Sequence, residues 1–300
     1  MTAIPLDSVH RLDFKNLEYI FKSKSISYQY TANQCTASKR IFQSAQKVRI
    51  LGMTANYEAD NIPGFRSSTI KKRRALLPLL NDAHEQTDIL AQQFEGDFYI
   101  EKYATEYYFK KYAPQYDVLH LSLYPGLNQQ SMDKNYLAFS EDGHQQEDNF
   151  LVTTEIQALP LHVGLTVLNY SKIDCRQMSN ANGLMAISAA FMYAGSQAVL
   201  YNLWSNKSDF LPAILSSYYQ NLQANLPKDR ALQKAKLDYL KASNDTTAHP
   251  AYWASLLQFG ALDPLEISEP VIHIWWFVLP IAFIGILGWW CLQGLKQRKK

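Results

Sequence analysis

The sequence predicts an α/β fold, a three-layer sandwich with a mostly parallel central sheet and one C-terminal transmembrane helix. Short apolar runs recur along the chain and alternate with helical patterns. This alternation is typical of parallel sheets that helices cover on both faces. Near the C-terminus an uncharged apolar segment is long enough to cross a bilayer.

Four apolar runs are expected to form buried strands, because they are short and rich in β-branched residues. They are Val48–Met53, Val118–Leu123, Leu165–Tyr170 and Ala198–Leu203. Between them, apolar residues repeat every three or four positions, which predicts helices. These patterns cover Leu76–Phe94, Leu184–Ala194, Phe210–Leu222 and a segment after Pro227 that includes Leu232, Ala235 and Tyr239. The polar stretches Thr54–Arg74 and Asn128–Asn149 are expected to be loops.

The segment Val271–Leu292 has 22 residues and no Asp, Glu, Lys or Arg. As a helix it would extend ~33 Å, which exceeds the ~30 Å hydrocarbon core of a bilayer. Tryptophan pairs at Trp275-Trp276 and Trp289-Trp290 lie near its two ends, where interfacial rings are expected. The alternative is a buried core helix, but core helices of this length rarely lack all charge. We therefore expect a single-pass anchor in contact with membrane lipid.

The predicted organisation is a domain over residues 1–265, a linker over 266–270, the transmembrane helix over 271–292 and a basic tail over 293–300. The positive tail is typical of the cytoplasmic side of a membrane. Met1–Tyr19 contains no secretory signal that would export the domain. The two ends therefore leave open which side of the membrane the domain faces.

Composition and motifs exclude several kinds of site. A hydrophobic content of 47% and a net charge of +2 describe an ordinary globular surface, so we expect no nucleic-acid partner. The three cysteines fit neither a disulfide framework nor a Cys-x-x-Cys metal site. No glycine-rich phosphate loop follows any predicted strand. We therefore predict no metal and no cofactor.

Several short motifs occur in an order that resembles the CHAT domain family, whose caspase-like fold is often joined to tetratricopeptide repeats. The motifs are Ile4-Pro5, Ile26-Ser27-Tyr28, Leu79–Phe94, Asp117–Ser122, Thr166–Asn169, Gly183–Gly195, Asn202-Leu203-Trp204 and His249–Ala254. The resemblance covers most of Ile4–Leu262 and implies a caspase-like sandwich. Because Thr2-Ala3-Ile4-Pro5 resembles the interior of the family's domain, we expect this chain to be the C-terminal portion of a longer protein. The expected partners are upstream tetratricopeptide repeats or another protein.

The resemblance also implies where catalytic residues would lie. In the family a cysteine ends one strand and a histidine ends its neighbour, so that the imidazole can lower the pKa of the thiol. Here Tyr124 takes the histidine position and Ser171 takes the cysteine position. A tyrosine titrates near 10 and a serine without a base is a weak nucleophile. The predicted function is therefore a membrane-tethered, catalytically degenerate signalling or scaffold module.

An enzymatic alternative uses displaced residues. His120 alternates with Ser122 and Tyr124, so the three side chains are expected on one face of their strand. A cysteine or serine endopeptidase would then pair His120 with Cys175 or Ser171. The competing interpretation is that His120 is a packed core histidine and that Cys175 is an inert loop residue.

Overall fold

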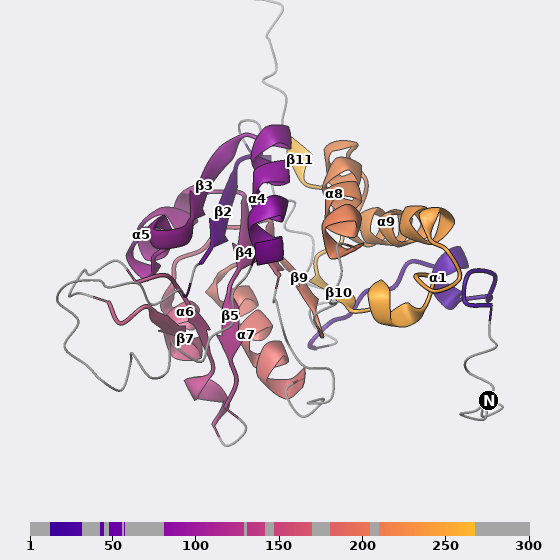
Figure 1. The fold of residues 1–300 in the computed structure, drawn as a ribbon. Coiled ribbons are helices and arrows are strands. Elements are labelled where there is room, and N and C mark those ends of the chain that lie inside the picture. The colour runs from indigo at the N-terminus through magenta and orange to yellow at the C-terminus, as the bar shows by residue number, and fades with distance from the viewer. Residues whose placement is uncertain are drawn as a thin grey trace, which may run out of the picture.

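A six-stranded sheet forms the centre of the domain (Figure 1). The computed structural model describes residues 13–31, 43–44, 48–55, 57, 81–128, 131–141, 147–169, 181–204 and 210–267. The strand order is β10-β9-β8-β4-β2-β3, and only the β10–β9 pair is antiparallel. The strands are β2 Ile50–Thr54, β3 Gly96–Ile100, β4 Val118–Ser122, β8 Leu165–Leu168, β9 Ala198–Asn202 and β10 Leu256–Gly260. The predicted α/β fold with a mostly parallel sheet is confirmed.

Helices cover both faces of this sheet (Figure 1). One layer contains α4 Asn81–Gln93, α8 Phe210–Gln223 and α9 Lys228–Ala242, beside which lies the short α1 Ile20–Ser23. The other layer contains α5 Glu106–Tyr112, α6 Thr153–Ala158 and α7 Ala181–Ala194. Single 3-10 turns lie at Glu101–Tyr103, Ala113–Gln115, Met132–Lys134 and Pro250–Tyr252.

Alternation along each strand divides the core in two. On β4, Val118 packs with α8 and α9, whereas Leu119 and Leu121 pack with α5, α6 and α7. Because successive side chains point to opposite faces, a strand that is buried on both sides must be apolar throughout. For this reason the continuous apolar runs in the sequence predict these strands.

The four predicted strands correspond to β2, β4, β8 and β9, with ends that differ by one or two residues. The prediction that Asn128–Asn149 is entirely a loop is wrong. Within it, β6 Tyr136–Ala138 pairs with β5 Tyr124–Gly126 and with β7 Phe150–Val152 to form a separate antiparallel sheet. Three-residue strands are too short to show an alternating pattern.

The C-terminal part of the described chain ends in a strand. β11 Glu266–Ile267, at the start of the predicted linker, pairs in parallel with β1 Gln43–Ser44. Within the described ranges, no helix has both the length and the apolar character needed to cross a membrane. The predicted transmembrane segment Val271–Leu292 lies outside the residues that the structure describes.

Candidate functional site

Polar side chains gather where the parallel strands end. Thr54 ends β2, Ser122 ends β4, Asn169 follows β8 and Asn202 ends β9, and all four are buried. Ligands of open α/β sheets bind at this carboxyl edge of the strands. It is also the edge at which the sequence predicts the degenerate dyad.

A chain of hydrogen bonds runs inward from this edge. The amide of Asn169 donates to Ser122 Oγ at 3.2 Å, and Ser122 Oγ lies 3.3 Å from His120 Nε2. On the other side of the ring, His120 Nδ1 lies 2.9 Å from the hydroxyl of Tyr219 on α8. The imidazole is therefore held between the strand end and a helix.

Both ring nitrogens of His120 are engaged in these bonds, and its side chain is fully buried. Burial lowers the pKa of the imidazole to about 4, because the charged form loses its hydration. At neutral pH the ring is uncharged and shielded from solvent. Full burial, two engaged ring nitrogens and low basicity are features of a structural histidine, and they oppose the role of a general base that the enzymatic alternative needs.

Tyr124 does not continue the strand of His120 and Ser122, so the expectation of three side chains on one strand face is wrong. β4 ends at Ser122, and Tyr124 begins β5 in the small antiparallel sheet. Its backbone N–H donates to the hydroxyl of Tyr57 at 2.8 Å, and this hydroxyl donates to the carbonyl of Ala138 at 2.7 Å. The hydroxyl of Tyr57 therefore fixes the place where the chain leaves one sheet for the other.

The remaining predicted residues, Ser171 and Cys175, lie outside the described residues. β4 and β8 are hydrogen-bonded neighbours, as the alignment with the family requires, with Leu121 opposite Leu168. The approach of Ser171 to Tyr124, and of Ser171 or Cys175 to His120, stays a prediction.

One group of acids among the described residues is close enough together to hold a cation: Glu106, Glu147 and Glu155. The ammonium of Lys110 already lies between them, at 2.7, 2.7 and 3.0 Å from their carboxylates. Burial raises the pKa of the Glu106 carboxyl to about 7, although Lys110 opposes the rise. The arrangement is an ion-pair network centred on Lys110. Its sequence signal is the Glu106–Lys110 spacing of four on a helix.

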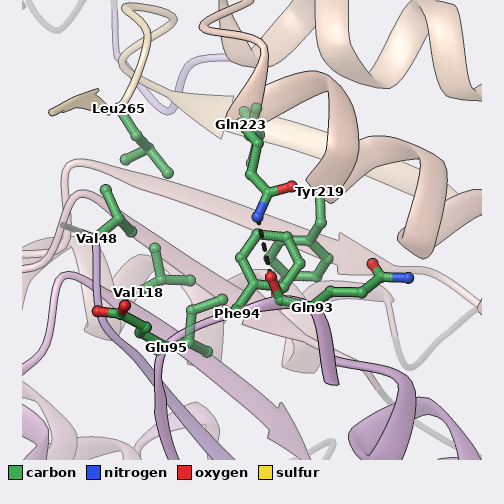
Figure 2. A pocket seen from close by; sticks show the side chains of 10 residues that line it. Val48, Gln93, Phe94, Glu95, Val118, Tyr219, Gln223 and Leu265 are labelled. Carbon is green, nitrogen blue, oxygen red and sulfur yellow. Dashed lines mark hydrogen bonds between the residues drawn. The ribbon is translucent and has the colours of Figure 1, made fainter. Parts of the chain in front are cut away.

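A cavity of about 280 Å³ lies toward the opposite end of the sheet from the polar edge, beside the first residues of β2 and β4 (Figure 2). Val118 and Leu265 form part of its apolar wall, and the rings of Phe94 and Tyr219 form another part (Figure 2). At its rim the amide of Gln223 donates to the Gln93 carbonyl at 3.2 Å. The residues that line this cavity come from several separate segments of the chain, so no local sequence motif predicts the cavity.

The family model described as CHAT domain matches residues 1–261. Human tetratricopeptide repeat protein 28 is 28% identical over 115 residues, which cover 38% of this chain and 4% of that protein. The mouse protein of the same name is 30% identical over 115 residues, covering 37% of this chain and 4% of that protein. The chain thus spans about 4% of the length of these curated relatives.

Two solved structures are similar at low identity. The Saccharomyces cerevisiae separase-securin complex gives a TM-score of 0.46 at 13% identity, covering 85% of this chain and 15% of that chain. The Arg specific cysteine proteinase gingipain R gives a TM-score of 0.42 at 12% identity, covering 77% of this chain and 48% of that chain.

Proposed function

The chain belongs to the CHAT domain family, and on that premise we propose that it is a catalytically degenerate caspase-like module. In this proposal the domain binds protein partners and does not cleave them. A membrane anchor at Val271–Leu292 holds it at a bilayer as a signalling or scaffold unit.

The observation that carries the proposal is the state of His120. The imidazole of His120, four positions before Tyr124, is buried and hydrogen-bonded through both nitrogens, and burial lowers its pKa to about 4, which makes it a weak base. A general base must reach the proton it removes, within ~2.6–3.2 Å of the reacting atom. Tyr124 at the family's histidine position and Ser171 at its cysteine position further support the loss of the dyad.

Partners are proposed from the relatives. Both curated relatives are tetratricopeptide repeat proteins, so repeats of this kind are the first candidates for attachment or binding. No nucleic-acid partner is proposed, given the net charge of +2.

The test of degeneracy is proteolysis by the purified full chain in mild detergent. It is incubated with a degenerate peptide library, and products are read by mass spectrometry. We expect no cleavage, and no labelling of Ser171 by acylating probes. Cleavage that disappears in Cys175→Ala or Ser171→Ala, and persists in the matched control Cys35→Ala, would instead establish an endopeptidase with displaced residues.

A complementary test restores the family's residues. The double variant Tyr124→His, Ser171→Cys should gain cleavage if the two positions are correctly aligned, because a thiolate and an imidazole would then be paired. Gain of cleavage in either single variant, Tyr124→His or Ser171→Cys, would contradict the expectation that activity requires both the imidazole and the thiol.

The anchor is tested by extraction of membranes with alkaline carbonate. We expect the full chain to stay with the membranes, and two Asp substitutions near Phe283 to release it. Each carboxylate costs ~2.5–3.5 kcal/mol at the centre of a membrane helix. Recovery of the unaltered chain in the supernatant contradicts the anchor and leaves the proposal of degeneracy intact.

A further inference from the structure

A second cavity, of about 190 Å³, lies between the N-terminal segment, α9 and β10. α1 lies beside α9 in this part of the molecule (Figure 1). Apolar and aromatic side chains form much of the wall, among them Phe21, Leu232, Trp253 and Leu256. All the residues that line this cavity belong to the described part of the chain.

Two opposite charges from α9 also line this cavity, Asp229 and Lys236. They are seven positions apart, which is about two helical turns, so both lie on the same side of the helix. Their Cα atoms are then ~10.5 Å apart along the helix axis. This is farther than the spacing of three or four positions at which two side chains of one helix form an ion pair. Neither forms an ion pair with any residue that the structure describes.

Each charge is fixed by one neutral neighbour. The ammonium of Lys236 donates to the carbonyl of Leu256 at 2.8 Å, which leaves donors for a ligand. The carboxylate of Asp229 accepts from the hydroxyl of Ser25. Burial lowers the pKa of Lys236 to about 8, because its charged form loses hydration without gaining an anion. An anionic ligand group would supply the missing partner.

The amides that line the cavity are already used within the protein. Gln233 donates to the carbonyl of Phe21 at 2.7 Å, and Gln258 accepts from the hydroxyl of Tyr218 at 2.9 Å. Ligand selection therefore depends on the two charges and on the apolar wall. A simple anion would pair with Lys236 but not with Asp229, and a simple cation would pair with Asp229 but not with Lys236.

We propose that this cavity binds a short zwitterionic peptide, whose free amine pairs with Asp229 and whose free carboxylate pairs with Lys236. The separation of the two groups on α9 suits a ligand whose charges are separated by at least one peptide unit. Hydrogen bonds between charged groups give the orientation, and an apolar side chain of the peptide contacts the aromatic wall. The proposal is independent of whether the domain cleaves peptides.

The experiment is isothermal titration calorimetry of the full chain in mild detergent with the dipeptide Ala-Leu. Two blocked forms serve as matched ligands, N-acetyl-Ala-Leu without the amine charge and Ala-Leu-amide without the carboxylate. We expect Ala-Leu to bind at least tenfold more tightly than either blocked form. Equal binding of the three, or no binding of Ala-Leu at millimolar concentration, overturns the proposal.

Two conservative variants assign each end of the ligand. Lys236→Gln keeps a donor for the Leu256 carbonyl, and it should abolish the preference for the free carboxylate over the amide. Asp229→Asn keeps an acceptor for Ser25, and it should abolish the preference for the free amine over the acetylated form. The matched control variants Lys241→Gln and Asp245→Asn, at exposed positions near the end of the same helix, should keep both preferences. Loss of a preference in a control, or its retention in the matching variant, contradicts the assignment.

Discussion

The hydroxyl of Tyr219 lies 2.9 Å from Nδ1 of His120, and their ring centroids are 5.8 Å apart. The bond joins α8 to the centre of the sheet, and both side chains are buried. A buried polar group is costly when its partner is removed, so this pair should matter more to stability than to chemistry.

Replacing the imidazole tests this directly. His120→Leu leaves the hydroxyls of Tyr219 and Ser122 without their shared partner, and we expect a loss of ~2–4 kcal/mol in the free energy of unfolding. Tyr219→Phe removes one bond and should cost ~1–2 kcal/mol. Urea unfolding measures both. An unchanged stability in His120→Leu would contradict a structural role for the ring.

The same histidine predicts a pH dependence. Its pKa falls from 6.5 in a free side chain to about 4 in the folded protein, so the unfolded chain binds more protons between these values. Stability is therefore fully present above about pH 6.5 and is lost as the pH falls toward 4, by about 3 kcal/mol. Unfolding measured across this window in the parent and in His120→Leu should show a flatter profile for the variant. Parallel profiles would contradict the shift.

The Glu106–Lys110 pair predicts the opposite dependence. Lys110→Met leaves a buried carboxyl without its cation, and we expect a loss of ~2–3 kcal/mol near pH 8. A carboxyl with a raised pKa contributes stability below pH 4.5 that is lost as the pH rises through about 7. The deficit should therefore be smaller at pH 5 than at pH 8.

Two variants control for the loss of a lysine as such. Adding Glu106→Gln to Lys110→Met should recover part of the stability at pH 8, because no charge is then buried alone. Lys241→Met removes an exposed lysine 3.9 Å from Asp238 and should cause no measurable loss. A deficit in Lys110→Met that is equal at both pH values would contradict the role of Glu106.

Gly195 is predicted to resist substitution. Its φ is +119°, and an added Cβ would lie 1.9 Å from the carbonyl oxygen of Leu161. Gly195→Ala should therefore lower the free energy of unfolding by about 2 kcal/mol or more. Gly183→Ala is the matched control, because its closest neighbour is a terminal carbon of Leu127 and alanine favours the helix. Equal effects of the two substitutions would contradict the strain at Gly195.

The sequence predicted the central strands well because burial on both faces leaves a continuous apolar run. β3 was not predicted, since it lies at the sheet edge and its sequence Gly-Asp-Phe-Tyr-Ile mixes charge with aromatic residues. The family resemblance predicts a site position at Tyr124, but the sequence does not place this residue in a second sheet, because strand alternation assumes that the strand continues. Some residues of the second cavity, such as Phe21 and Gln233, are 212 positions apart in the sequence, so only the fold brings them together.

The pairing of β10 with β9, and of Tyr28 with Phe259, has a consequence for the order of folding. The amide of Gln29 donates to the carbonyl of Gly260, across 231 positions of the sequence. During synthesis the segment at Tyr28 cannot pair until Phe259 and Gly260 have been added to the chain. Contacts of such long range slow folding and prolong the exposure of apolar surface. The part of the sheet beside β10 is thus completed late, when the segment at Tyr28 pairs with Phe259.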